Sequence, residues 1–99
     1  MTFKILESNI IDWADKRNLL RRENSFIQLT KTIEEVGEVA RALIKGNKND
    51  LVDGIGDVLV TIIILAKQNG LDPTTCLEMA YNEIKDRSGE TINGSFVKD

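Results

Sequence analysis

Apolar residues recur along the chain at the three- and four-residue spacing of amphipathic helices, and this pattern predicts four helices in series. We expect them at about residues 3–18, 25–45, 50–69 and 73–88. Gly46 and Gly70 follow the second and third helices, where glycine readily adopts the left-handed conformation of a helix end. Asp72 and Pro73 suit the start of the fourth helix, because a missing N–H costs least there. The pattern indicates an all-α four-helix bundle, with one domain over residues 1–99.

The third helix is apolar on almost every side from Val58 to Leu65. A strand is the alternative for such a β-branched run, but the length from Asp50 to Gly70 favours a helix. A helix that is hydrophobic all round is normally buried all round. A chain of 99 residues is too short to surround it, so we expect a homodimer or homotetramer to complete the core.

The tail, residues 89–99, carries the pair Asn93-Gly94 between β-prone residues. Asn-Gly is a strong signal for a two-residue hairpin turn, so we expect a short β-hairpin, with an extended tail as the alternative. An isolated hairpin is at best marginally stable in water, and we therefore expect it to dock on the helices.

Composition narrows the classes of function. A net charge of -3 and a pI near 5.0 argue against a nucleic-acid partner. The chain has no histidine, which excludes histidine-based metal sites and nucleophile pairs. The single cysteine, Cys76, excludes an internal disulfide and suits a reducing compartment. The apolar runs are too short for a signal peptide or a membrane span, so we expect a cytoplasmic protein with no membrane partner.

An acidic cluster is the main candidate for chemistry. Glu34 and Glu38 are four residues apart and Glu35 and Glu38 three apart, so their side chains converge on one side of the second helix. Asp57 lies as far beyond the loop as Glu38 lies before it, and at about 1.5 Å per residue the two are level across an antiparallel pair of helices. Asp53 lies one turn nearer the loop, on the same face as Asp57.

Oxygen ligands without histidine or cysteine select Mg²⁺, Mn²⁺ or Ca²⁺, and Mg²⁺ suits a site that processes phosphates. Gly37 and Gly56 fall at nearly the same level, and each costs about 1 kcal/mol in a helix relative to alanine. We therefore expect the two helix backbones to approach closely at these glycines. The alternative is that the carboxylates form a solvated helix face, neutralised by cations such as Lys31 and Arg41.

Two segments resemble the all-α nucleoside triphosphate pyrophosphohydrolases, above all the small MazG-like proteins. They are Glu34-Glu35-Val36-Gly37-Glu38-Val39 and Asp53-Gly54-Ile55-Gly56-Asp57-Val58-Leu59. The family pattern is Glu-x-x-Glu, a gap, and Glu-x-x-Asp, which Glu35, Glu38 and Asp57 match. Gly54 stands where the pattern has its third Glu, and Asp53 is the candidate substitute. The resemblance extends to Trp13-Ala14-Asp15-Lys16-Arg17-Asn18, Gln28, Lys31 and Ala80-Tyr81-Asn82-Glu83-Ile84-Lys85-Asp86-Arg87.

The resemblance implies a MazG-like bundle that hydrolyses (deoxy)nucleoside triphosphates to monophosphate and pyrophosphate, with a housecleaning role in nucleotide pools. It implies that Mg²⁺, with Mn²⁺ as an alternative, is held by Glu35, Glu38, Asp57 and Asp53. Glu34 or Glu35 would activate the attacking water. Contacts to the nucleotide would come from Trp13, Arg17, Gln28, Lys31, Asn82, Lys85 and Arg87.

Plainer roles exist for several of these residues. Trp13 could belong to the core, Lys31 could only neutralise nearby carboxylates, and Lys85 and Arg87 could be ordinary cations at a helix C-terminus. Two alternatives concern the whole chain. One is a non-catalytic oligomerisation or nucleotide-binding module, which Gly54 would suit, and the other is a specialised dUTPase or dCTP pyrophosphatase.

Overall fold

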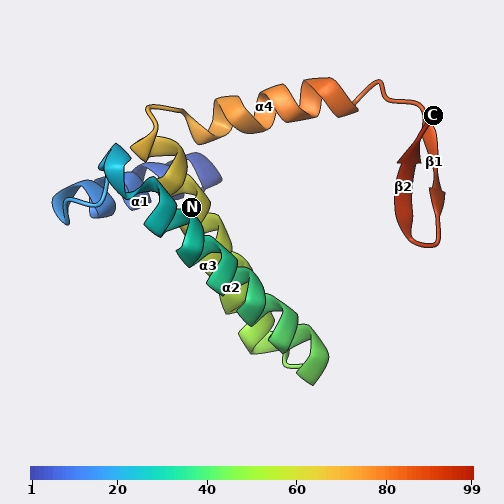
Figure 1. Ribbon diagram of the computed structural model, residues 1–99, viewed down its shortest axis with the longest axis horizontal. Helices are drawn as coiled ribbons and strands as arrows, with labels where there is room; N and C mark the ends of the chain where they lie inside the picture. Colours follow the sequence, from blue (N-terminus) through green and yellow to red (C-terminus); the bar gives the residue numbers. More distant parts are fainter.

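Four helices, one 3₁₀ turn and a two-stranded hairpin follow one another along the chain. The computed structural model describes all 99 residues. The helices are α1 (Phe3–Lys16), α2 (Ser25–Lys45), α3 (Lys48–Gln68) and α4 (Pro73–Ile84), and the 3₁₀ turn is η1 (Arg22–Asn24). The strands are β1 (Gly89–Ile92) and β2 (Ser95–Lys98) (Figure 1). The predicted helical class with a short C-terminal hairpin is confirmed.

Three helix ends differ from the expected ones. The first helix ends at Lys16 rather than near residue 18, because Asn18 adopts a left-handed conformation with φ of 57°. The third starts at Lys48 rather than residue 50, because the Asn47 side chain caps it by accepting a hydrogen bond from a backbone N–H. The fourth ends at Ile84 rather than near residue 88, where no tertiary packing supports a further turn.

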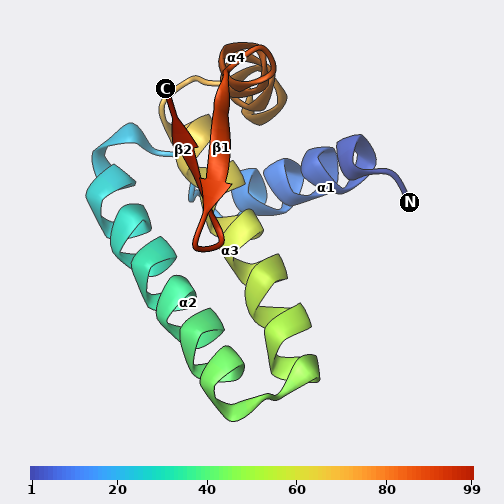
Figure 2. The ribbon, with the colours of Figure 1, turned by 90° about the vertical axis from the view of Figure 1, so that its right-hand side faces the viewer.

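α2 and α3 form an antiparallel pair joined by a short loop, and Figure 2 shows them side by side with the loop at their lower end. The predicted close approach at Gly37 and Gly56 is wrong, because a side chain placed at either would meet nothing within 4 Å. The approach occurs at Gly54, where a β-carbon added to the glycine would lie 3.1 Å from Cγ2 of Val39. Among the three glycines within these two helices, only Gly54, the position that departs from the family pattern, packs closely on the facing helix.

The core is small and lies where α1 and α2 pack on α3. Its buried apolar side chains are Ala14, Ala42, Ile63 and Ile64. Two amides connect the elements around it: Nε2 of Gln28 donates to the carbonyl of Thr61 at 3.0 Å, and Nε2 of Gln68 donates to the carbonyl of Leu19 at 2.9 Å. These bonds join α2 to α3, and α3 to the segment after α1. None of the helices combines the length and hydropathy that crossing a membrane requires.

The last part of the chain stands away from the body that residues 1–72 form. α4 leaves the end of α3 and runs outward, and the hairpin lies at its far end (Figure 1). The hairpin has the predicted turn, since Asn93 and Gly94 have φ of 51° and 81° and the strands pair antiparallel. The expectation that it docks on the helices is wrong for the single chain, because α4 carries it away from them and all its residues are exposed.

Candidate functional site

The α2–α3 pair bears an acidic cleft of about 280 Å³. Its lining residues are Glu35, Glu38, Arg41, Ala42, Lys45, Asp50, Asp53, Gly54 and Asp57. The carboxylates of α2 recur every three or four residues and so share one side of that helix. Those of α3 do the same, and the antiparallel pairing brings the two rows opposite each other. The predicted juxtaposition across the helical hairpin is therefore present.

The charge of the acidic cleft dominates the charge of the chain. Five carboxylates and two cations line it, a formal charge of -3, and the whole chain also carries -3. The rest of the molecule is therefore neutral overall. The excess of carboxylates at this cleft attracts diffusing cations.

The carboxylates line the same cleft but do not converge on one position where a metal ion could bind. No group of three or more acidic side chains lies close enough to hold a metal ion in this arrangement. Arg41 occupies part of the space, with its Nη1 at 3.4 Å from Oε1 of Glu38. Both side chains are more than half exposed, at 60% and 56%, so this ion pair is weak and easily exchanged for another cation.

The structure divides the predicted acidic residues. Glu35, Glu38, Asp53 and Asp57 all line the acidic cleft, and Asp50, which the sequence pattern did not single out, joins them. Glu34 does not line it, although it is next to Glu35 in the chain. Consecutive helical residues point about 100° apart, which accounts for this difference.

Gly54 explains how the cleft accommodates its departure from the family pattern. Its backbone packs against Val39 of the facing helix, and Gly54 is itself buried. A larger residue at position 54 would have to displace Val39, which is β-branched and stiff in a helix. Asp53, adjacent to Gly54, lines the acidic cleft and is the carboxylate nearest in sequence to the Glu that the family pattern has at position 54.

An apolar groove between α1 and α3 adjoins the acidic cleft. It measures about 450 Å³ and its lining residues are Phe3, Leu6, Glu7, Ile10, Val52, Asp53, Gly56, Asp57, Leu59, Val60 and Ile63. Asp53 and Asp57 line both hollows, so a single ligand could contact carboxylates at one end and apolar side chains at the other. The sequence pattern did not predict this groove, because its two walls come from helices that are far apart in the chain.

Trp13 lies further along α1. It lines a hollow of about 320 Å³ with Leu6, Asn9, Ile10 and Val60, three of which also line the apolar groove. One face of its ring is covered by the guanidinium of Arg17, whose Cζ lies 4.2 Å from the ring centroid. Arg17 also donates to the carbonyl of Trp13 at 3.0 Å. The exposed indole therefore offers a ligand only its remaining face and edge.

Two predicted substrate contacts on α2 have different surroundings. Gln28 is half-buried, and its side-chain amide donates a hydrogen bond to the carbonyl of Thr61. This bond gives Gln28 a structural role. Lys31 is exposed and forms no ion pair, although Glu35 lies one turn further along the helix. Lys31 is therefore free to bind an anion near the end of the acidic cleft.

The predicted phosphate contacts near the C-terminus are not brought to the acidic cleft of the same chain. Asn82 lies in α4, and Lys85 and Arg87 follow its last residue, Ile84. All three lie on the segment that runs outward from the body (Figure 1). Arg87 is instead paired with Glu83, at 3.2 Å.

The residues of the acidic cleft suit a hard divalent cation. Their donor atoms are carboxylate oxygens, the ligands that Mg²⁺ and Mn²⁺ prefer, and the chain has no histidine to compete. The cleft is open to solvent, which suits an ion that retains part of its water. Long Glu side chains can also converge on an ion by rotamer changes without movement of the backbone.

The comparisons with known proteins agree with the family resemblance found in the sequence. Residues 25–90 match the family model of the MazG nucleotide pyrophosphohydrolase domain, a range that holds α2, α3 and α4 but not α1. The chain is also 40% identical over 67 residues to an uncharacterized 18.2 kDa protein in the rep-hol intergenic region of Haemophilus phage HP1 (strain HP1c1). The match covers 68% of this chain and 41% of that relative. No solved structure matches the chain significantly. The chain belongs to the MazG nucleotide pyrophosphohydrolase domain family.

Proposed function

We propose that this chain is a Mg²⁺-dependent pyrophosphohydrolase of (deoxy)nucleoside triphosphates, releasing monophosphate and pyrophosphate. The observation that carries the proposal is the acidic cleft, in which the three residues of the family pattern, Glu35, Glu38 and Asp57, line one hollow. Family membership over residues 25–90 supports the reaction class. A housecleaning role in nucleotide pools is part of the same proposal.

The proposed metal ligands are Glu35, Glu38, Asp53 and Asp57, with Mn²⁺ as the alternative ion. A bound divalent cation would neutralise charge on the phosphates and favour the departure of pyrophosphate. Glu38 would first give up its weak pair with Arg41, which would then be free to contact a phosphate oxygen.

Glu35 is the candidate that accepts a proton from the attacking water, since it lines the acidic cleft and Glu34 does not. The reaction consumes one water and breaks one bond between the α and β phosphates. Lys31, one turn along α2 from Glu35 and free of ion pairs, is placed to contact the phosphates.

The nucleoside would lie in the apolar groove, which shares Asp53 and Asp57 with the acidic cleft. Phosphates held at the shared carboxylates would direct the base toward Leu6 and Ile10 of α1. α1 lies outside the range that matches the family model, so this placement of the base rests on the apolar groove alone.

Pyrophosphate release from a panel of ribo- and deoxynucleoside triphosphates, with Mg²⁺ or Mn²⁺, tests the proposal. Glu38→Gln and Glu35→Gln should each lower kcat/KM by about a hundredfold or more. Glu78→Gln is the matched control, because Glu78 is an exposed carboxylate of α4 without an ion pair. A preference for dUTP or dCTP alone would identify a specialised enzyme.

A non-catalytic nucleotide-binding module is the second candidate, and two observations favour it. Gly54 replaces a carboxylate of the family pattern, and no three acidic side chains are already grouped for a metal ion. Nucleotide binding without any turnover in the panel would establish this candidate and overturn the first.

A further inference from the structure

Two cations, Arg41 and Lys45, line the acidic cleft together with its five carboxylates. They are four residues apart on α2 and therefore share one side of that helix. A cation among carboxylates can be a structural counter-ion, or it can bind an anionic part of a ligand. The surroundings of the two side chains decide between these roles.

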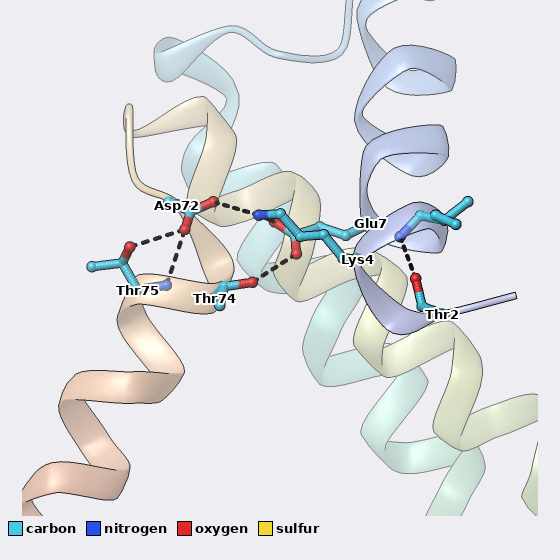
Figure 3. A network of polar contacts seen from close by, with 7 residues as sticks. Thr2, Lys4, Glu7, Asp72, Thr74 and Thr75 are labelled. Atoms are coloured by element: carbon cyan, nitrogen blue, oxygen red, sulfur yellow. Dashed lines mark hydrogen bonds and ion pairs between the residues drawn. The ribbon is translucent and has the colours of Figure 1, made fainter.

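The carboxylates that tie α4 to α1 show what a structural role looks like in this protein (Figure 3). Oε2 of Glu7 accepts a hydrogen bond from the hydroxyl of Thr74 at 2.9 Å, and the Glu7 side chain is only 2% exposed. Oδ2 of Asp72 accepts bonds from the N–H and the hydroxyl of Thr75, at 3.1 and 2.9 Å. Neutral donors thus fix these acids, and Lys4 adds only contacts of 3.9 and 3.8 Å to them.

The carboxylates of the acidic cleft have no such support. None of the five accepts a hydrogen bond from a hydroxyl, an amide or a backbone N–H. The one ion pair in the cleft joins Arg41 to Glu38, and Lys45 forms none. These side chains are therefore free to exchange their partners when a ligand enters.

Arg41 competes with a metal ion for Glu38, which is one of the residues of the family pattern. Its Nη1 lies 3.4 Å from Oε1 of that carboxylate. At a separation of about 6 Å in water, a charge of +1 lowers the affinity for a divalent cation about tenfold, and less at physiological salt. The acidic cleft should therefore bind a free divalent cation more weakly than its five carboxylates alone would.

The two cations lie at the loop end of the acidic cleft. Counted back along α2 from Gly46, Lys45 comes first, then Arg41, then Glu38, and each residue adds about 1.5 Å of distance from the loop. The apolar groove meets the cleft at Asp57, which is level with Glu38. A nucleotide whose base lies in the groove would therefore extend its last two phosphates toward the loop end.

We propose that Arg41 and Lys45 bind the β- and γ-phosphates of the substrate at the loop end of the acidic cleft, and that Arg41 leaves Glu38 to do so. A guanidinium forms two parallel hydrogen bonds with a phosphate, which favours this contact over the exposed pair with Glu38. Arg41 thereby couples the two ligands, because it frees the metal site only when a triphosphate chain is present. The inference rests on the proposed function for the place of the metal and of the nucleotide.

Binding of Mn²⁺ alone, followed by electron paramagnetic resonance at low salt, tests the competition at Glu38. Arg41→Gln should bind Mn²⁺ about fivefold more tightly than wild type or better, whereas Arg41→Lys keeps the charge and should stay closer to wild type. Lys16→Gln is the matched control, because it removes the same charge from α1, where Lys16 pairs with Asp12 outside the acidic cleft. Equal Mn²⁺ affinities of Arg41→Gln and wild type would overturn the proposal.

A nucleoside triphosphate with a methylene bridge between its α and β phosphates tests the second contact, since it cannot release pyrophosphate. In saturating Mn²⁺, Arg41→Gln and Lys45→Gln should each bind this analogue about tenfold more weakly than wild type. For Arg41→Gln this change is opposite in sign to the effect on the metal alone. The corresponding monophosphate lacks the β- and γ-phosphates, so its affinity should change less than threefold. Unchanged binding of the analogue, or an equal loss for the monophosphate, contradicts the assignment.

Pyrophosphate release, measured beside these affinities, separates the inference from the proposed function. The expected changes in binding, in a protein without turnover, would leave the inference standing and refute the enzyme. Turnover by wild type, with variants that bind Mn²⁺ and the analogue as wild type does, would refute the inference alone. If no variant binds either ligand, both fail.

Discussion

The contact between Thr74 and Glu7 should be worth more to stability than any ion pair on the surface of this protein. Thr74→Val keeps the shape of the side chain and removes the only hydroxyl that donates to the Glu7 carboxylate. Glu7 remains buried, at 2% exposure, with only the distant Nζ of Lys4 at 3.9 Å. A buried charged group that loses its donor costs about 2 kcal/mol or more in free energy of unfolding.

For a chain of this length, such a loss lowers the midpoint of thermal unfolding by about 8–16 °C. The assay is thermal and urea denaturation followed by far-ultraviolet circular dichroism, at one protein concentration for all variants. Thr74→Ser keeps the hydroxyl and should lose less than half as much. Lys4→Gln is the second control, and should cost less than about 1 kcal/mol, because Lys4 is 69% exposed.

A double-mutant cycle with Glu7→Gln decides whether the charge is the cause. When Glu7 is already neutral, Thr74→Val leaves no unpaired carboxylate, and its cost should fall by about 1 kcal/mol or more. Equal costs of Thr74→Val in both backgrounds, or equal costs of Thr74→Val and Thr74→Ser, would refute this reasoning.

Two further substitutions test other parts of the structure. Gly37→Ala should raise the free energy of unfolding by about 1 kcal/mol. Gly54→Ala should raise it clearly less, because the added β-carbon would lie 3.1 Å from Cγ2 of Val39. Equal increases for the two variants, measured by thermal denaturation, would contradict the close packing at Gly54. Hydrogen bonds from the hydroxyl and N–H of Thr75 hold the pKa of Asp72 below its usual value of 3.8, so their stabilisation is present above about pH 4 and is lost as the pH falls through the lowered pKa. Thr75→Val should therefore be less stable than wild type at pH 7 and approach it in acid, and a difference independent of pH would show that Asp72 is not involved.

Gly54 links the packing of the helices to the composition of the acidic cleft. At this position a carboxylate side chain would have to displace Val39, and the chain has a glycine there and an aspartate one residue earlier. A cleft with Asp53 in place of the expected Glu has a shorter side chain on a neighbouring face of α3. The choice of metal and the rate of reaction should depend on this replacement of Glu by Asp53. Pyrophosphate release by the Asp53→Asn variant, measured with Mg²⁺ and with Mn²⁺, tests this dependence directly.

The helices were predictable because their signals are local. Spacing of apolar residues, Gly46 with φ of 66°, and Asp72 followed by Pro73 each act within one or two turns of the chain. The Asn93-Gly94 turn is equally local and forms as expected. The predicted helix ends failed where the deciding contact was a side-chain cap, at Asn47, or the absence of any packing, near residue 88.

The acidic cleft could be predicted for the same reason. The positions of Glu35 and Glu38 on one helix and of Asp53 and Asp57 on the next follow from helical periodicity, and the short loop at Gly46 leaves only an antiparallel return. The sequence could not separate Glu34 from Glu35, because the rotation of a helix about its axis depends on what it packs against.

By itself, then, the sequence determined the four helices, the hairpin turn and the gathering of carboxylates, since each follows from repeats and caps within a few residues. Only the tertiary structure decided that α2 and α3 approach at Gly54, that a groove between α1 and α3 shares Asp53 and Asp57 with the acidic cleft, and that α4 leads outward. These features depend on the crossing of helices far apart in the chain and on the direction set at Asp72, Thr74 and Glu7. Such contacts leave no repeating pattern in the sequence. Their partners lie far apart in the chain and are brought together by packing between helices rather than by the geometry of one helix.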